Sequence, residues 1–527
     1  MINQSLSLRL FLILISVGFG VAVKAQLQPK PTLQWQKCIG GTQIDAAYSI
    51  VATYDSAYVV VGYSDSDNND IDTNYGSTDC YVAKLSASGN IVWKLTLGGS
   101  SFDQATYVQQ TSDSGFILTA ISMSNDVDFD TNRGMRDAWV IKLSKNGTVD
   151  WKKNYGGSMN EIPLCIKQTT DGGYVFVGWS ASSDGDLSVN KGSEDCWIVK
   201  LDASGNIVWQ KSMGGSSEDH FTSVIQTSDG GYLAAGSIRS GDGDITGFYG
   251  SHDVWVVKFD ASGYVMWQKN YGGSSEDHFG DHGLAGAVIE TFDGGYALSC
   301  FSNSTDFDVT GNHGDYDAWI LKLTSNGTID WQKSFGGSGD DEGMFITQMP
   351  DSTLIVTGLT NSLDGDVDTM YGVYDVWCFK VSAAGNLLWE QSFGGMFKES
   401  AFAMDQTRDT SVILAGVATM AGGQVTGYKG GLYDMWVVKL KMTPVINSVD
   451  DLNKTQVIIS PNPASHTVEL LHAPENVSWE VLNTAGQLIK KGQGTRMSIG
   501  DMPHGIYFIR LYDRNGIPFK YEKLIKI

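Results

Sequence analysis

The sequence repeats one pattern seven times, and this repetition is the strongest constraint on its fold. A tryptophan opens each copy, and successive copies are 58 residues apart except for one step of 64. Two glycines follow each tryptophan, and an acidic residue stands four positions after them. A fixed period of this kind is typical of folds in which one supersecondary unit is copied and packed on its neighbours. The seven tryptophans are Trp35, Trp93, Trp151, Trp209, Trp267, Trp331 and Trp389.

Each copy predicts four β-strands. In the fourth copy the expected strands are 221–227, 232–237, 253–260 and 264–270. An Asp-Gly-Gly turn joins the first two, and Ala261-Ser262-Gly263 joins the last two, as tight hairpins require. The third strand contains Val254-Trp255-Val256-Val257, which is apolar on both faces. A sheet with two apolar faces is expected where each sheet lies between two others.

The repeat therefore predicts an all-β fold, a seven-bladed β-propeller over residues 35–441 with four strands per blade. The array begins with an isolated Trp35 strand and ends on the 434–440 strand, which lacks a tryptophan partner. We expect the N-terminal strand to complete the last blade and close the ring. An open solenoid would need capping repeats, which the sequence does not contain.

The repeat motifs resemble those of seven-bladed propellers in bacterial secreted proteins. The shared patterns are GG-x-x-x-D, D-x-GG-Y and G-x-x-x-S-x-DGD, and they cover the whole array. The stretch that ends at Trp209 is also similar to the tryptophan-docking turn of quinoprotein propellers. That second similarity implies a structural turn rather than quinone chemistry.

The two ends of the chain have the character of export signals. Residues 1–25 are predicted to form a signal peptide, with an apolar run after Arg9 and a small-residue cleavage site at Ala25. No other stretch approaches 18 apolar residues, so we expect no transmembrane segment in the mature protein. A polar linker at 442–455 follows the repeats.

Residues 456–527 show alternating strand patterns and resemble the type A sorting domain of the type IX secretion system. The matching residues are Pro461, Asn462 and Pro463 at its start, and Gly505 and Tyr507 near its end. The resemblance implies a small immunoglobulin-like β-sandwich, handling by the type IX machinery, and release from the cell or attachment to the outer-membrane surface. The alternative is an ordinary accessory sandwich.

The composition limits the classes of partner. The formal net charge is −23, which argues against nucleic acid because phosphate binding needs a basic surface. The six cysteines stand at scattered positions within the repeats, so we expect buried apolar side chains rather than a disulfide framework.

The loop between the second and third strands of each copy is rich in aspartate and is expected on the same face as the Gly-Gly crossover. Alternating carboxylates suit calcium, which takes oxygen ligands, although no copy supplies a complete EF-hand loop. The alternative is turn chemistry, in which Asp side chains accept hydrogen bonds from nearby backbone amides. No cofactor is required, and calcium is the candidate. The candidate ligands are Asp70, Asp72, Asp126, Asp128, Asp130, Asp184, Asp186, Asp242, Asp244, Asp306, Asp308, Asp364, Asp366 and Asp368.

All propeller histidines fall in the fourth and fifth copies, which is where the repeat loses its symmetry. The fifth copy also carries the insertion of six residues. A cluster of histidines and aspartates on one rim is a candidate site for a metal, an anion or a sugar, whereas polar residues in polar loops are the plain alternative. The candidate residues are His220, His252, His278, Asp281, His282 and His313.

These features favour a secreted or cell-surface protein of binding or adhesion type, without catalysis, that presents an acidic loop face to a glycan, a protein or a cation. The alternative is a secreted hydrolase or lyase that uses the histidine rim of the fifth copy. The sequence has no nucleophile elbow, HExxH motif or phosphate loop to support that alternative. A purely structural propeller is the third possibility.

Overall fold

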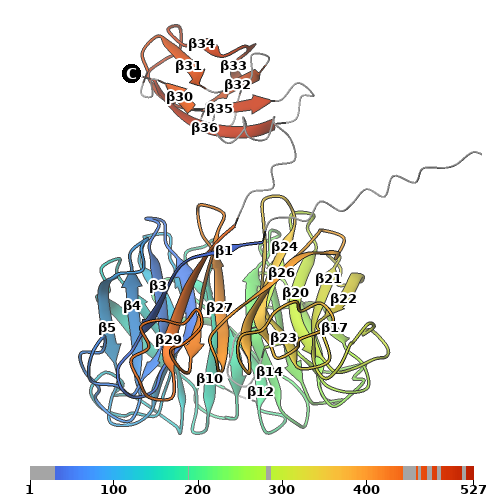
Figure 1. Ribbon diagram of the computed structural model, residues 1–527. Coiled ribbons are helices and arrows are strands. Elements are labelled where there is room, and N and C mark those ends of the chain that lie inside the picture. The colour runs from blue at the N-terminus through green and yellow to red at the C-terminus, as the bar shows by residue number, and fades with distance from the viewer. Residues whose placement is uncertain are drawn as a thin grey trace, which may run out of the picture. The chain divides into compact units, whose positions relative to one another are not determined.

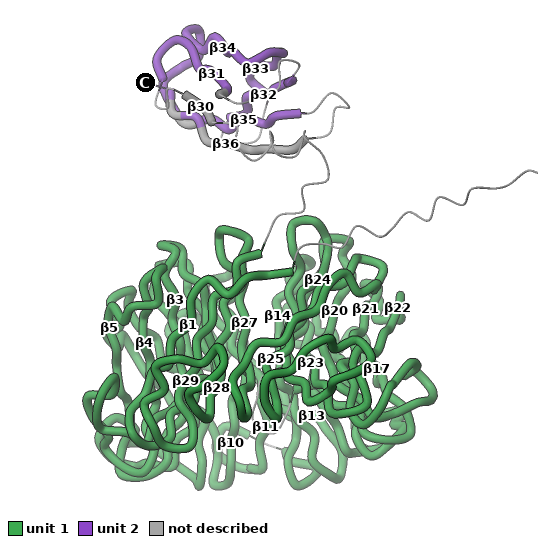
Figure 2. The backbone as a smooth tube through the Cα atoms, viewed as in Figure 1, with its two compact units in different colours: residues 1–443 green, residues 444–527 purple. Residues whose placement is uncertain are grey.

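The computed structural model describes residues 30–442, apart from 188 and 281–285, and residues 458–526, apart from 461–463, 472–476, 484–487 and 513–517. The contacts divide the chain into two compact units, 1–443 and 444–527 (Figure 2). The expected signal peptide and nearly all of the expected linker lie outside the described residues. So do Asp281, His282, Pro461, Asn462 and Pro463.

The first unit is built from seven antiparallel sheets arranged as propeller blades (Figure 1). The first three sheets are β2 (Asp45–Ala52), β3 (Tyr58–Ser64), β4 (Asp79–Leu85) and β5 (Ile91–Leu97); β6 (Asp103–Gln110), β7 (Phe116–Ser122), β8 (Asp137–Leu143) and β9 (Val149–Tyr155); and β10 (Glu161–Gln168), β11 (Tyr174–Ser180), β12 (Asp195–Leu201) and β13 (Ile207–Met213).

The next three are β14 (Asp219–Gln226), β15 (Tyr232–Ile238), β16 (Asp253–Phe259) and β17 (Val265–Tyr271); β18 (Asp277–His278), β19 (Ala287–Glu290), β20 (Tyr296–Ser302), β21 (Asp317–Leu323) and β22 (Ile329–Phe335); and β23 (Asp341–Gln348), β24 (Leu354–Thr360), β25 (Asp375–Val381) and β26 (Leu387–Phe393). The insertion in the fifth copy divides the innermost strand into β18 and β19, and both pair with β20.

The seventh sheet combines the two ends of the repeat array. It consists of β27 (Glu399–Gln406), β28 (Val412–Ala418), β29 (Asp434–Lys441) and, as its fourth strand, β1 (Thr32–Ile39). β1 pairs antiparallel with β29, with Trp35 opposite Lys439. This pairing is the one that the isolated Trp35 strand predicted.

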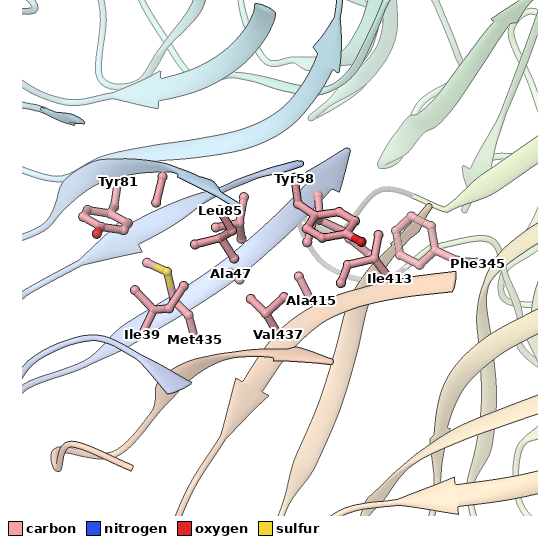
Figure 3. Packing of buried hydrophobic residues seen from close by; sticks show 14 of the residues in the cluster. Ile39, Ala47, Tyr58, Tyr81, Leu85, Phe345, Ile413, Ala415, Met435 and Val437 are labelled. Carbon is pink, nitrogen blue, oxygen red and sulfur yellow. The ribbon is translucent and has the colours of Figure 1, made fainter. Parts of the chain in front are cut away.

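The sheets contact one another in chain order, and the contacts return from the seventh sheet to the first. The innermost strands touch in the order β2, β6, β10, β14, β19, β23, β27, and β27 touches β2. A cavity of about 220 Å³ is lined by residues of all seven innermost strands. Figure 3 shows the apolar packing in which Ala47 and Tyr58 of the first sheet share a cluster with Ile413, Ala415 and Val437 of the seventh.

The middle strands of each sheet are buried on both faces, as the apolar runs predicted. Val254, Trp255, Val256 and Val257 are each fully buried. Burying both faces of every sheet removes a large apolar area from water, which is the main favourable term in folding. All six cysteines are buried and unpaired, so the expectation of apolar packing without disulfides is confirmed.

A tryptophan of each outermost strand packs on the neighbouring blade. The Trp151 ring lies against the turn that contains Gly205, where a Cβ would come within 2.9 Å of the ring. Gly205 has a φ of +75°, a conformation that glycine adopts without strain. Trp35 repeats the contact between the seventh and first blades, and its indole Nε1 donates to the Ala87 carbonyl at 3.1 Å.

The second unit contains two antiparallel sheets around a shared apolar core. One consists of β30 (Ile458–Ser460), β31 (Thr467–Leu471) and β34 (Arg496–Ser498). The other consists of β32 (Ser478–Leu482), β33 (Leu488–Gln493), β35 (Gly505–Tyr512) and β36 (Pro518–Lys526). Val468, Trp479, Met497 and Ile509 lie in one buried cluster. The immunoglobulin-like classification stays a prediction.

Candidate functional site

The repeated acidic residue at the start of each innermost strand supports the fold. Asp45 is fully buried, and its carboxylate accepts hydrogen bonds from the Gly41 amide at 2.7 Å and the Ser66 hydroxyl at 3.0 Å. The same amide contact joins Gly99 to Asp103, and Gly215 to Asp219. Buried carboxylates need such donors, so these acids hold the crossover between blades rather than a ligand.

The aspartate-rich loops lie directly against the Gly-Gly crossovers, on the face that the sequence predicted. The Asp186 amide donates to the Gly156 carbonyl at 3.0 Å, and the corresponding bond recurs in all seven copies, with Gln424 and Gly394 in the last. The carboxylates also face the crossover, because Asp184 accepts from the Ser158 amide at 2.8 Å and Asp186 from the Gly156 amide at 3.1 Å.

Several of these carboxylates have cationic partners in addition. Asp186 pairs with Arg133 at 2.7 Å, and Asp72 pairs with Lys94 at 2.7 Å. The amides that Asp184 and Asp186 contact belong to the crossover, 26 and 30 residues away in sequence, so the bonds tie the loop to the crossover and differ from local turn chemistry. Calcium binding by these loops stays a prediction. To bind calcium, the carboxylate oxygens would have to give up their hydrogen bonds to the backbone amides.

A pocket of about 460 Å³ lies where β6, β10 and β14 begin, and we call it the rim pocket. One part of its wall is aromatic or aliphatic and another part is charged. Its lining residues are Tyr48, Phe102, Gln104, Ile121, Arg136, Ile162, Trp179, Glu194, Glu218 and His220. This volume is within the range of small-molecule sites, which combine apolar walls with a few polar groups.

Contacts between the lining residues hold the rim pocket in shape. The His220 ring stacks on Trp179 with ring centroids 5.0 Å apart, and His220 Nε2 lies 2.6 Å from Glu194 Oε2. The Arg136 guanidinium lies over the Phe102 ring, 5.6 Å from its centroid. Arg136 and Glu194 both stand one residue before a buried Asp of a third strand, which places them at the strand entrance.

Two of the predicted histidines come together on the next stretch of the rim. His252 precedes β16 of the fourth blade, and His278 ends β18 of the fifth. Their ring centroids are 4.4 Å apart, and Glu276 completes a group whose ligand atoms all lie within 4.8 Å of one another. The Tyr316 hydroxyl donates to Glu276, and this hydrogen bond lowers the pKa of the Glu276 carboxyl.

The remaining predicted histidines are placed differently. His313 contacts Asp317 through Nδ1 at 2.6 Å and donates its backbone amide to the same carboxylate. Burial raises the pKa of Asp317 to about 6. His313 therefore covers a buried carboxylate of its own blade, whereas His220 belongs to the rim pocket. Asp281 and His282 lie outside the described residues.

Sequence reasoning missed the charged and aromatic residues beside the histidines. Arg136, Glu194 and His252 occupy one repeat position in successive copies, directly before the buried Asp of the third strand. Glu218 and Glu276 occupy another, directly before the acid of the innermost strand. These residues could have been found from the sequence, because each stands at a variable position directly before a repeated acid. Residues that support the fold repeat in every copy, whereas residues of a site differ from copy to copy.

The second unit carries the decisive likeness to known proteins. Gly505 and Tyr507 lie in β35, and the Tyr507 hydroxyl donates to the Pro503 carbonyl at 3.0 Å. Residues 459–526 match the family described as secretion system C-terminal sorting domain. This sorting domain indicates a protein that the type IX machinery handles and that is secreted or attached to the outer-membrane surface.

Other likenesses are more distant. Regulatory protein FlaEY of Caulobacter vibrioides is 23% identical over 273 residues, which are 46% of this chain and 28% of that protein. The chain thus matches little more than a quarter of the length of that relative.

Several solved structures match this chain at low TM-scores. PorZ, a surface component of the type IX secretion system of Porphyromonas gingivalis, is 9% identical with a TM-score of 0.24, covering 91% of this chain and 81% of that one. Apocarotenoid oxygenase of Synechocystis is 10% identical with a TM-score of 0.35, covering 71% and 96%. A GH32 β-fructofuranosidase of Bombyx mori is 12% identical with a TM-score of 0.28, covering 78% and 92%. At these scores the likenesses carry no argument about function.

In the part of the chain that the structure describes, no helix is long and apolar enough to cross a membrane.

Proposed function

We propose that this secreted or surface-attached propeller is a binding protein that takes a saccharide in the rim pocket. The observation that carries the proposal is the composition of that pocket. Tyr48, Phe102 and Trp179 supply aromatic surface, and Glu194 and Glu218 supply hydrogen-bond acceptors, within a volume of about 460 Å³.

The chemistry of sugars fits this combination. A pyranose ring has an apolar C–H face, which packs on aromatic rings, and a rim of hydroxyl groups, which donate to carboxylates and accept from guanidinium or amide groups. Arg136 and Gln104 supply such donors in the pocket wall. Residues of four neighbouring blades line the pocket, so its shape is set by a rigid scaffold before a ligand arrives.

The location supports the same proposal. Residues that differ between copies gather on this rim, whereas the buried positions beneath them carry an acid in every copy. A propeller needs the repeated residues to fold, and it does not need Trp179 or Glu194 at these positions. The net charge of −23 favours a neutral or cationic saccharide over an acidic one.

The test is binding of the full chain to a printed panel of glycans, followed by calorimetry with the glycans that bind. We expect Trp179→Ala and Glu194→Gln each to weaken binding by at least about tenfold, which corresponds to about 1.4 kcal/mol. Tyr264→Ala is the matched control, because Tyr264 is an exposed aromatic residue in the turn between β16 and β17.

The absence of any bound glycan, or equal binding by all variants, would contradict the proposal. Mass spectrometry of the incubated glycans separates binding from turnover. Products that form with the intact chain and not with the variants would favour the hydrolase or lyase alternative over a binding protein.

A further inference from the structure

We propose that His252, Glu276 and His278 form a binding site for one divalent transition-metal ion of the zinc type. The site is separate from the rim pocket and does not depend on a saccharide. One ligand atom from each of the three residues lies within 4.8 Å of the other two, and His278 Nε2 is 3.7 Å from Glu276 Oε2.

The backbones of two blades hold these side chains in place. A parallel bridge joins His252 to Glu276, and the Asp277 amide donates to the His252 carbonyl at 3.0 Å. Glu276 and His278 flank Asp277, whose side chain is fully buried. Zinc at its usual bond lengths holds its ligand atoms about 3.3 Å from one another. Side-chain rotations that bring the three ligand atoms closer by up to about 1.5 Å would therefore complete the site.

The donor set selects the class of metal. Two imidazoles and one carboxylate suit zinc and its neighbours, whereas calcium and magnesium take oxygen ligands almost exclusively. Three protein ligands leave a fourth position for water or for a group of a bound molecule. The site is half-buried, so an ion reaches it from solvent.

Neighbouring residues support the ligands in the way that outer-shell groups do in metal sites. The Tyr316 hydroxyl donates to Glu276, and the His278 ring stacks on Phe301 at a centroid distance of 4.9 Å. The charge of Arg239 opposes the ion, and Arg239 donates to His252 Nε2. Arg239 also pairs with Glu218, so it has a second partner when the ion replaces it at His252.

The corresponding positions in the other copies lack this chemistry. Thr78, Arg136, Glu194, Tyr316, Tyr374 and Tyr433 stand where the fourth copy has His252. Ala46, Gln104, Ile162, His220, Glu342 and Ser400 stand where the fifth copy has His278. Only the junction of the fourth and fifth blades joins two histidines and a carboxylate at these positions.

The test uses the full chain after dialysis against a chelator, with Co²⁺ and Zn²⁺ as the probes. We expect one Co²⁺ per chain, visible d–d absorption of low coordination number, displacement by Zn²⁺, and no competition from millimolar Ca²⁺. His278→Ala and His252→Ala should each weaken binding by at least 100-fold. His313→Ala is the matched control and should bind as the intact chain does, because His313 contacts Asp317 instead.

Substoichiometric binding by the intact chain, or undiminished binding by His278→Ala, would overturn the proposal. Each variant is first checked in chelator for an unchanged melting temperature, and Tyr316→Phe provides a second measurement that leaves all three ligands in place. We expect Tyr316→Phe to weaken Co²⁺ binding by about tenfold, since removing an outer-shell hydrogen bond costs about 10- to 100-fold in affinity. If the intact chain binds the metal ion but no glycan, the metal site is supported and only the proposed saccharide site in the rim pocket is contradicted.

Discussion

A lysine of the third strand pairs with a turn aspartate in every blade, and it is buried in six of the seven. In the fourth blade, Lys258 Nζ lies 2.9 Å from Asp229 Oδ2, and the lysine side chain is only 3% exposed whereas that of Asp229 is 54% exposed. The Asp229 carboxylate also accepts from the Thr227 hydroxyl at 2.6 Å and the Gly231 amide at 2.9 Å. The repeated lysine thus ties the third strand to the turn between the first and second strands.

We expect Asp229→Ala to lower the free energy of unfolding by about 1.5–3 kcal/mol, because it removes a charged hydrogen-bond partner and leaves the Lys258 ammonium buried without a carboxylate. Asp260→Ala is the matched control. Asp260 accepts from the Ser262 and Tyr264 amides in an exposed turn, so we expect its loss to cost clearly less than that of Asp229. Urea unfolding followed by tryptophan fluorescence measures both, and equal losses would contradict a specific role for the lysine pair.

The element that joins neighbouring blades is the outermost strand, through its tryptophan. Trp93, Trp151 and Trp209 each lie on a glycine of the next blade, at Gly147, Gly205 and Gly263. Glycine is needed at these positions for two reasons: the backbone has a positive φ, and the tryptophan ring leaves no room for a Cβ. Because the turn belongs to one blade and the tryptophan to another, this contact exists only when two copies pack together.

We expect Gly205→Ala to destabilise the propeller by about 2–4 kcal/mol, from backbone strain at positive φ together with displacement of Trp151. Gly172→Ala separates the two causes, because Gly172 has a φ of +82° and no atom within 4 Å of an added Cβ. That control should cost only about 1 kcal/mol, for strain alone. Shifts in the urea midpoint measure the difference, and similar shifts for the two variants would show that the tryptophan contact adds nothing.

Two sets of carboxyl groups with opposite pKa shifts recur around the whole propeller. Burial raises the pKa of the third-strand aspartates, to about 6 for Asp79 and Asp375 and to about 7 for Asp434. Partial burial also acts on the turn aspartates, but hydrogen bonds from a threonine and a lysine lower the pKa of Asp171 and Asp229 to about 2.

These shifts predict a stability maximum near pH 4–5. A raised carboxyl pKa means that the folded state keeps protons that the unfolded state has lost, so stability falls as the pH rises from about 4 to about 7. A lowered pKa contributes stability above about pH 4 that is lost as the pH falls towards 2. We therefore expect a higher urea midpoint at pH 5 than at pH 8.

The variant Asp375→Asn should reduce that difference, since asparagine removes one titrating group from a buried position. Asp130→Asn is the matched control, because Asp130 is exposed in an aspartate-rich loop. A urea midpoint that rises steadily from pH 5 to pH 8 would contradict the prediction.

The sequence alone predicted most of the architecture. In the fourth copy the expected strands 221–227, 232–237, 253–260 and 264–270 agree with β14 to β17 within two residues at each end. Strand type and strand ends depend on local alternation and turn residues, and seven copies repeat the same signal. In the second unit, β33 and β34 are hard to recognise as strands from the sequence, because their alternation is weak.

The sequence by itself also placed the histidines in two adjacent copies and the aspartate loops beside the crossovers, since both follow from position within the repeat. Only the tertiary structure decided which of these side chains meet. His252 and His278 come together with Glu276, whereas His313 turns to Asp317, although all three histidines lie in neighbouring loops of the sequence. The physical reason is that a site on a propeller rim is assembled from strand ends of different blades, and their separation in space depends on how whole sheets pack, which no local pattern records.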